Sequence, residues 1–197
     1  MRILNAEFIK SVGLTGEIED YYMPEICFMG RSNVGKSSMI NSLVMQKIAR
    51  TSSTPGATRT INIFKVYYES QGEKKYVIFS DFPGFGFAKV SKAMSHSWKT
   101  MMERYVSNNK RIKKLIWLFD VRREIDYLDE MVMEWIFNNK LEFCLVLTKS
   151  DKEKQGDLAR KKRFFNNYFK GNPVFLYSSK TGQGKKELLS YLMSSIE

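Results

Sequence analysis

The sequence contains little cysteine, histidine or proline: two, one and four residues among 197. Two cysteines and one histidine cannot supply the four ligands of a structural zinc site. Cys27 and Cys144 each lie inside an apolar run, and we expect both to be reduced core residues. The sequence therefore predicts a fold held together by its core, without disulfides or structural zinc.

Long hydrophobic runs are also absent. The run from Leu115 to Phe119 is far shorter than the roughly 20 residues that span a bilayer. Near the N-terminus, Asn5, Glu7 and Lys10 precede any apolar stretch, unlike the arrangement in a signal peptide. We therefore expect a cytoplasmic protein with no membrane partner.

Positive charge is in excess, with 32 Lys and Arg against 21 Asp and Glu, a net charge of +11. This excess favours polyanionic partners such as nucleic acid or nucleotides. Basic clusters at 110–114 and 160–163 are either solvated or face RNA, and both interpretations stay open. The length and the 43% hydrophobic content indicate one globular domain, for which we expect a monomer.

Apolar and β-branched runs alternate with segments of helical periodicity. Six strands are predicted, at 25–29, 61–68, 75–81, 115–121, 143–148 and 174–177. Helices are predicted at 38–45, 127–137, 157–169 and 185–196. This order predicts an α/β fold with a doubly wound, mostly parallel six-stranded sheet and helices on both faces.

A hairpin with its loop at 69–73 would supply one antiparallel strand. Residues 1–22 are predicted to be an N-terminal extension packed on a domain that spans 23–197. Within this extension, Phe8, Ile9 and Val12 could add an edge segment to the sheet.

A glycine-rich segment follows the first strand of the predicted domain and matches the phosphate-binding pattern G-x-x-x-x-G-K-[ST]. It comprises Gly30, Arg31, Ser32, Asn33, Val34, Gly35, Lys36 and Ser37. Its backbone N–H groups and the following helix terminus would bind an anion. Lys36 would reach the β and γ phosphates, and the Ser37 hydroxyl would ligate Mg²⁺. A chance glycine turn is the alternative, which the placement between strand and helix disfavours.

A base-reading loop is predicted where Thr148, Lys149, Ser150 and Asp151 follow an apolar strand. A carboxylate at Asp151 would accept both N1–H and the N2 amine of guanine, whereas adenine offers no such pair of donors. The aliphatic stem of Lys149 would lie along the ring. After the last strand come Ser178, Ser179 and Lys180, where the Ser179 N–H would contact guanine O6.

Two further loops would surround the γ phosphate. Asp81, Phe82, Pro83 and Gly84 follow a strand, so Asp81 would hold Mg²⁺ through water and the Gly84 N–H would approach the phosphate. The other loop contains Gly56, Ala57, Thr58, Arg59 and Thr60. Thr58 would offer its hydroxyl to Mg²⁺ and its N–H to the γ phosphate, although this loop alone would be read as an ordinary polar one. The predicted catalytic groups are Lys36, Thr58 and Gly84, and the predicted metal ligands are Ser37 and Thr58.

These elements occur in the order typical of a G domain, and longer stretches resemble one family. GRSNVGKSSMINSL, TSSTPGATRTINIF and DFPGFGFAKVSK closely resemble the EngB family of bacterial GTPases, over nearly the whole chain. Asp120, Val121 and Arg122 look like that family's D-x-R feature. The resemblance implies a Ras-like fold that binds GTP and GDP with Mg²⁺. It also implies a role in assembling the large ribosomal subunit, with rRNA and ribosomal proteins as partners, and in cell division and septation.

Four residues depart from, or add to, the common pattern. Phe85 stands where Ras-like proteins place the glutamine that orients water, so intrinsic hydrolysis should be slow. Asn33 is either a site for an activating K⁺ or a turn residue. Phe82, Phe85 and Phe87 either cover the core or stack on an RNA base. The alternative to a GTP-operated switch is a passive rRNA-binding assembly factor with a structural nucleotide.

Overall fold

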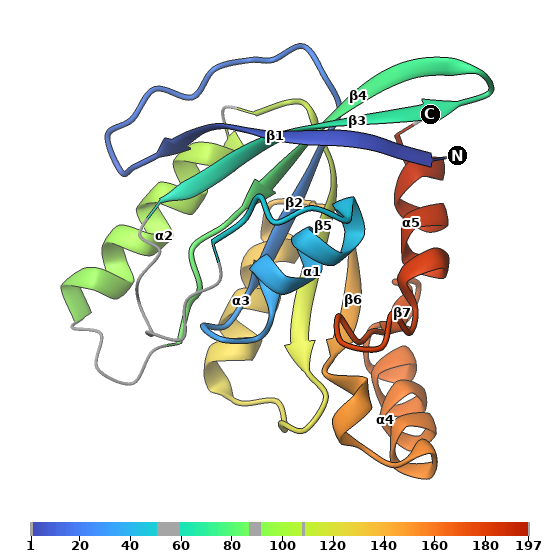
Figure 1. Ribbon diagram of the computed structural model, residues 1–197. Helices are drawn as coiled ribbons and strands as arrows, with labels where there is room; N and C mark the ends of the chain where they lie inside the picture. Colours follow the sequence, from blue (N-terminus) through green and yellow to red (C-terminus); the bar gives the residue numbers. More distant parts are fainter. Residues whose placement is uncertain (1, 51–59, 87–91, 108, 197) are drawn as a thin grey trace.

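The computed structural model describes residues 2–50, 60–86, 92–107 and 109–196, with only the backbone of residues 92–98. Its strands are β1 (Arg2–Val12), β2 (Glu25–Gly30), β3 (Ile61–Ser70), β4 (Glu73–Asp81), β5 (Ile112–Asp120), β6 (Phe143–Thr148) and β7 (Val174–Leu176). Its α helices are α1 (Lys36–Val44), α2 (Lys92–Ser107), α3 (Tyr127–Asn138), α4 (Gln155–Tyr168) and α5 (Lys185–Ser194). Figure 1 shows how the helices surround the sheet.

The seven strands form a single sheet in the order β1-β3-β4-β2-β5-β6-β7. From β4 to β7 all neighbouring strands are parallel, whereas β3 runs antiparallel to both β4 and β1. The predicted α/β class and the single antiparallel strand are confirmed. The predicted count of six strands is wrong, because residues 2–12 pair with β3 and add a seventh strand at the edge.

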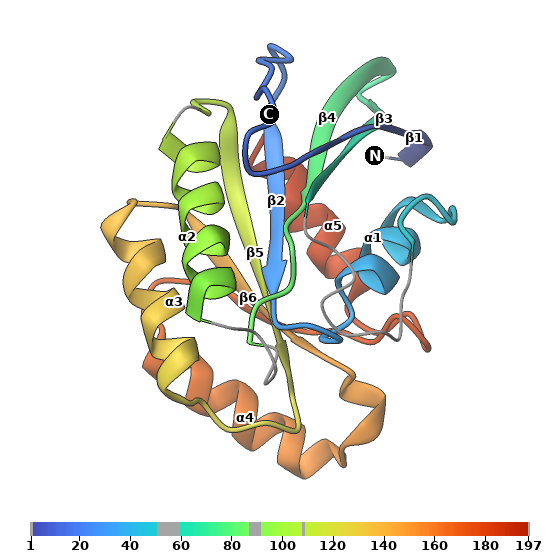
Figure 2. The same ribbon diagram turned by 90° about the vertical axis from the view of Figure 1, so that its left-hand side faces the viewer.

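Helices cover both faces of the sheet (Figure 2). On one face α2, α3 and α4 bury a core that includes Trp117 and Phe165, and on the other α1 and α5 bury a core that includes Phe28 and Leu188. Every residue of β2 and of β6 is buried, as expected for central parallel strands covered on both faces. The two cores hold the carboxyl ends of the strands in fixed positions.

The hairpin between β3 and β4 is tighter than predicted. Strand pairing continues to Ser70 and Glu73, so the loop is only Gln71 and Gly72 instead of 69–73. Both turn residues have positive φ values, 54° and 81°, as in the two-residue turns that match strand twist. No local composition signal separates such a turn from a longer loop at this site.

Several helix predictions also need correction. Helix α2 was not expected from the sequence, although its buried Met101, Met102 and Tyr105 have helical spacing. Met131 of α3 and Tyr168 of α4 follow the apolar periodicity of their helices but are exposed, because each lies at the margin of its apolar face. Cys27 and Cys144 are buried free thiols, as predicted. Within the described ranges, every helix is too short or too polar to cross a bilayer.

Candidate nucleotide-binding site

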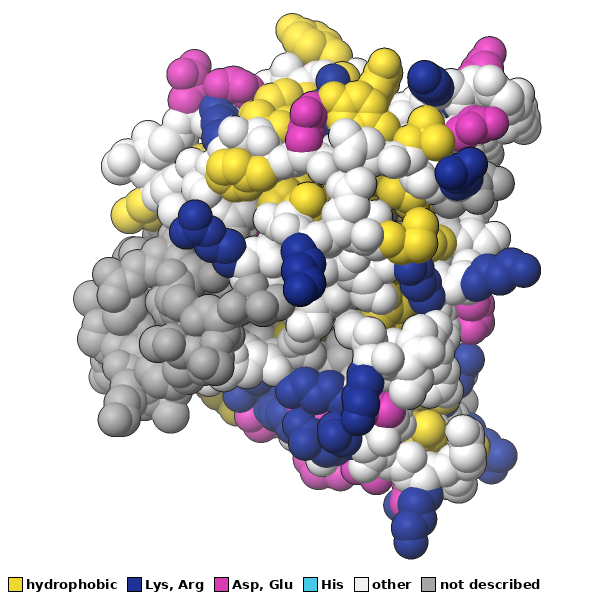
Figure 3. Space-filling model, viewed as in Figure 1, with side chains coloured by type: hydrophobic (Ala, Val, Ile, Leu, Met, Phe, Trp, Pro, Cys, Tyr) yellow, Lys and Arg dark blue, Asp and Glu magenta, His cyan; other side chains and the backbone are white. Residues whose placement is uncertain are grey.

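The predicted motifs meet at one end of the sheet. The strands β4, β2, β5 and β6 are neighbours, and they end at Asp81, Gly30, Asp120 and Thr148. Ligands of open α/β sheets bind outside these carboxyl ends. On the face shown in Figure 3, Lys and Arg side chains gather at the lower edge, where β5 and β6 end in Figure 1. The topology therefore places the phosphate loop and the base-reading loop side by side.

The phosphate loop ends in an uncapped helix N-terminus. Gly35 precedes α1 with a φ of 109°, in the left-handed region that favours glycine, and no side chain in the described part of the chain caps the helix. At Gly30, an added Cβ would lie 2.7 Å from the Leu118 carbonyl oxygen, so only glycine fits. Since no side chain caps the first turn of α1, its N–H groups can bind an anion.

Lys36, Ser37 and Asp81 form a compact group beside this loop. The Ser37 Oγ donates to Asp81 Oδ2 at 3.3 Å. Burial raises the pKa of Asp81, while Lys36 and Ser37 act in the opposite direction. Burial also lowers the pKa of Lys36, and the charge of Asp81 partly offsets that effect.

The second carboxylate oxygen of Asp81 is buried and has no hydrogen-bond partner among the described residues. A buried polar atom of this kind calls for a ligand or water. Mg²⁺ prefers oxygen ligands and retains several waters, so the Ser37 hydroxyl and a water held by Asp81 suit this ion. The residues present therefore fit a magnesium site.

Gly84 packs directly on the phosphate loop. A Cβ at this position would lie 2.8 Å from Ser32 Cα and 3.3 Å from Lys36 Nζ. The next residue is tied to the same loop, because the Ser32 N–H donates to the Phe85 carbonyl oxygen at 2.9 Å. The Asp81 to Gly84 segment therefore contacts the predicted phosphate site through backbone that tolerates no side chain at residue 84.

The base-reading loop is braced by its neighbours. Lys149 Nζ donates to the Asn33 carbonyl oxygen at 2.8 Å and lies 3.0 Å from Asp120 Oδ2. Burial acts to raise the pKa of Asp120, but hydrogen bonds from Arg122 and Lys149 outweigh it and hold that pKa below its usual range. Thr148 Oγ1 donates to the Val34 carbonyl oxygen, which ties β6 to the phosphate loop.

Asp151 is oriented by the segment after β7. The Ser178 Oγ donates to Asp151 Oδ1 at 2.7 Å and lowers the pKa of that carboxyl. The Ser178 Oγ also accepts the Lys180 N–H at 3.2 Å. The Ser150 Oγ donates to Gln183 Oε1. This contact was not predicted, because no local motif indicates it. These bonds keep the Asp151 carboxylate charged and fixed in direction.

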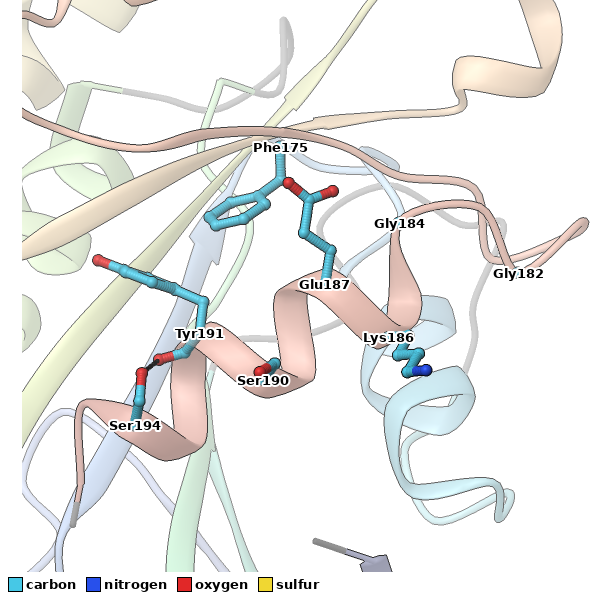
Figure 4. A pocket seen from close by; sticks show the side chains of 8 residues that line it. All are labelled: Phe175, Gly182, Gly184, Lys186, Glu187, Ser190, Tyr191 and Ser194. Atoms are coloured by element: carbon cyan, nitrogen blue, oxygen red, sulfur yellow. Dashed lines mark hydrogen bonds between the residues drawn. The ribbon is translucent and has the colours of Figure 1, made fainter.

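Ser179 and Lys180 are exposed beside a depression of about 830 Å³ between α1 and the loop after β7. Ser38 and Asn41 of α1 line the same depression. Another depression, of about 730 Å³, follows α5 and is shown in Figure 4. Phe175 and Tyr191 line it with their rings 5.1 Å apart, and no predicted nucleotide-binding residue lines it. The depression beside Ser179 is therefore the one that adjoins the predicted base site.

The Arg31 side chain pairs with two carboxylates at the start of α3. Its Nε lies 3.0 Å from Asp129 Oδ1, and its guanidinium also pairs with Asp126 at the start of α3. Asp126 and Asp129 form a capping box, and Arg123 pairs with both carboxylates. The D-x-x-D spacing was the sequence signal for this network, which was overlooked. Arg31 therefore joins the phosphate loop to α3.

Some predictions fall on residues that the structure does not describe: Gly56, Ala57, Thr58, Arg59 and Phe87. Thr60 is described, and its hydroxyl donates to Asn62 Oδ1 at 3.3 Å. Phe82 and Phe85 are buried, which confirms packing for these two rings. Lys114, from one of the predicted basic clusters, is also buried and pairs with Glu142, because it lies on a covered strand.

Comparison with known proteins connects this geometry to a family. The model of the 50S ribosome-binding GTPase family matches residues 25–149. A probable GTP-binding protein EngB from Aquifex aeolicus is 40% identical over 172 residues, which cover 87% of this chain and 90% of the relative. A protein of the same name from Fusobacterium nucleatum is 38% identical and covers 98% and 97% of the two chains.

Solved structures show the same fold. The crystal structure of a probable GTP-binding protein EngB superposes with a TM-score of 0.62 at 22% identity, covering 87% of this chain and 98% of that one. Aquifex aeolicus Era bound to GDP and AlF₄⁻ superposes with a TM-score of 0.75 at 19% identity, covering 89% of this chain and 57% of that one. The fold is that of a P-loop G domain, and the chain belongs to the EngB family of GTP-hydrolysing proteins.

Proposed function

We propose that this protein is a GTP-operated switch that acts in assembly of the large ribosomal subunit, with residues 23–197 as its G domain and 1–22 as an extension packed on it. The observation that carries the nucleotide part is the convergence of Lys36, Asp81 and Asp151 at neighbouring strand ends. A buried Asp81 oxygen without a hydrogen-bond partner lowers the stability of the fold unless a ligand or water binds to it. GTP with Mg²⁺ would use both groups.

Different residues of the chain would bind the phosphates, the base and the Mg²⁺ ion. Lys36 and the N–H groups of the phosphate loop would bind the β and γ phosphates, with the Gly84 N–H on the γ phosphate. Asp151 would accept two guanine hydrogen bonds. Ser37, Thr58 and, through water, Asp81 would hold Mg²⁺, which supplies positive charge to the phosphate oxygens when bound.

Intrinsic turnover would be slow because Phe85 has no group that can orient water, and its side chain is buried. Acceleration of hydrolysis would come from a ribosomal partner or from a K⁺ ion near Asn33. The φ of 60° at Asn33 also suits a plain turn role. Hydrolysis rates in K⁺ and Na⁺ at equal ionic strength decide between the two roles, since equal rates would leave only the turn role.

Two observations support a ribosomal partner. The matching family model is described as a ribosome-binding GTPase, and the chain carries a net charge of +11. In addition, a structural neighbour, Era, has been crystallised in complex with nucleotides 1506–1542 of 16S ribosomal RNA, so a protein of similar fold binds rRNA. We extend this to a cytoplasmic, monomeric protein that contacts rRNA and ribosomal proteins, with a further role in cell division and septation.

Sedimentation with purified large-subunit particles tests the proposal. The protein should pellet with particles in the presence of a non-hydrolysable GTP analogue and much less with GDP, because γ-phosphate contacts would order the binding surface. Lys36→Ala, which cannot hold the γ phosphate, should behave like the GDP form in both conditions. Equal pelleting in the two nucleotide states would favour the alternative, a passive rRNA-binding factor.

A further inference from the structure

Helix α4 carries two aromatic side chains on its surface. Phe164 is 51% exposed and Tyr168 is 43% exposed, one helical turn apart. Their rings are stacked, with centroids 5.8 Å apart and planes 25° apart. Single exposed apolar residues are common, but two stacked rings that are each about half exposed form a surface that another flat ring can extend.

Buried aromatic residues support this pair from below. Phe164 contacts Phe165 at a centroid distance of 5.2 Å, and Tyr168 contacts Phe169 at 4.9 Å. Both supporting rings are within the core, at 3% and 2% exposure. The exposed rings are therefore held in place by packing, so a ligand that stacks on them meets a surface already in position.

The surroundings of the pair are basic. The segment 158–172 contains five basic residues and no acidic residue. Arg160 and Asn167 are exposed and share the helix face of Phe164, four residues before it and three residues after it, while Arg163 is exposed on the adjoining face. Arg160 is partly neutralised by Asp157 at 2.8 Å, whereas Arg163 makes no ion pair with any described residue.

We propose that this face of α4, defined by Arg160, Arg163, Phe164, Asn167 and Tyr168, is a docking surface for single-stranded RNA. Unpaired bases stack on exposed aromatic rings, and arginines next to the rings neutralise the backbone phosphates. A protein partner is less favoured than RNA, because this face carries arginines and the segment 158–172 contains no acidic residue. The inference rests on the proposed function only for the source of the RNA, which would be rRNA.

The surface is connected to the nucleotide site along the chain. Helix α4 begins four residues after Asp151, and Lys161 Nζ donates to the carbonyl oxygen of Val121, next to Asp120. Asp120 in turn pairs with the base-reading Lys149. RNA on α4 would therefore lie on an element that is linked to Lys149 of the base-reading loop through Val121 and Asp120.

Fluorescence anisotropy with a labelled oligouridine of about 12 nucleotides tests the surface directly. The double variant Phe164→Ala/Tyr168→Ala should lose at least about tenfold in affinity, because stacking is removed. Arg163→Gln should weaken binding and flatten the dependence of log affinity on log salt by about 0.7 unit, the contribution of one phosphate contact on a single strand. Phe8→Ala on β1 is the matched control, since Phe8 is 52% exposed, and it should bind like the wild type.

Folding and nucleotide binding are checked by thermal unfolding and by GDP affinity, which should not change in Arg163→Gln. Wild-type oligouridine affinity in both the aromatic and the arginine variant would contradict the proposed RNA surface. An equal loss of affinity in Phe8→Ala would also contradict it. A wild-type dimer that the aromatic variant abolishes would assign the face to a second copy instead.

Particle sedimentation separates this inference from the proposed function. If the wild type and the aromatic variant pellet equally well with large-subunit particles, the proposed RNA surface is contradicted and the proposed ribosomal function is retained. If the aromatic variant loses oligouridine binding but the wild type does not pellet with the particles, the RNA surface is supported and the ribosomal function is contradicted.

Discussion

Lys149 Nζ lies 2.8 Å from the carbonyl oxygen of Asn33, so the loop predicted to read the base is bonded to the loop predicted to bind phosphate, 116 residues away in sequence. The same ammonium lies 3.0 Å from Asp120 Oδ2 at the end of β5. One side chain therefore ties the ends of three neighbouring strands together. This arrangement fixes the separation of the two binding loops.

Lys149→Ala should weaken GTP and GDP binding equally, by about tenfold or more, because hydrogen bonds to charged groups contribute about 1.5 to 3 kcal/mol. The equal effect follows because the contact lies on the base side, which both nucleotides share. Titration with a fluorescent guanine nucleotide measures it. Lys154→Ala, an exposed lysine before α4, is the control, and similar affinities for the two variants would contradict this role of Lys149.

Asp151→Asn should change base choice. The Asp151 carboxylate is held by Ser178 and would offer two acceptors to the guanine donor pair, whereas an amide would present a donor where guanine also donates. GTP affinity should fall by about a hundredfold or more, and xanthosine nucleotides should bind better than GTP. Competition titrations measure both, with Asp157→Asn on α4 as control. Unchanged GTP affinity would remove Asp151 from the base site.

Asp81→Asn should stabilise the nucleotide-free chain while abolishing Mg²⁺-dependent hydrolysis. Burial raises the pKa of Asp81 in the folded state, so its charged form costs stability above the unfolded pKa of about 3.9. That cost disappears as the pH falls through the raised folded pKa. At pH 7.5 the variant should be more stable by at least about 1 kcal/mol, because the neutral amide replaces a carboxylate whose charge is desolvated by burial.

Thermal unfolding at pH 7.5 and at pH 4.5 checks this sign. The stability advantage of Asp81→Asn should shrink at the lower pH, where wild-type Asp81 becomes protonated. An advantage that grows on acidification would mean that the carboxylate is stabilised in the fold, contrary to its burial and its unpartnered oxygen.

Gly184→Ala should destabilise the fold strongly. Gly184 has a φ of 74°, and an added Cβ would lie 1.9 Å from the Leu176 carbonyl oxygen, so the turn between β7 and α5 would have to open. We expect a loss of more than about 2 kcal/mol, seen as a Tm decrease of at least about 4 °C. Gly156→Ala in α4 meets no atom within 4 Å and should raise stability slightly. Equal Tm values for the two variants would contradict this account of the turn.

Much of the architecture was predictable because its signals are local. The apolar runs of β2, β5 and β6 identify buried parallel strands, and the glycine and lysine spacing of residues 30–37 identifies the phosphate loop. The seventh strand was missed as a firm element because β1 alternates imperfectly and pairs at the edge, with two register irregularities against β3. Tyr168 follows the apolar periodicity of α4 and is nevertheless exposed, because helical periodicity does not show where a buried face ends.

The contacts that brace the site were not predictable from local patterns. Lys149 with Asn33, Arg31 with Asp129 and Ser150 with Gln183 join residues far apart in sequence. Such pairs depend on which strands become neighbours, which the sheet order decides. The residue types were visible in the sequence, but their partners were not.

Single-turnover GTP hydrolysis with and without large-subunit particles tests the central claim most directly, namely that this chain is a GTP switch set by its ribosomal partner. Because Phe85 is buried and cannot orient water, the isolated protein should hydrolyse GTP slowly, and saturating particles should accelerate the step by at least about tenfold. Lys36→Ala should show no hydrolysis in either condition. An identical wild-type rate with and without bound particles would contradict the switch and leave a passive RNA-binding factor.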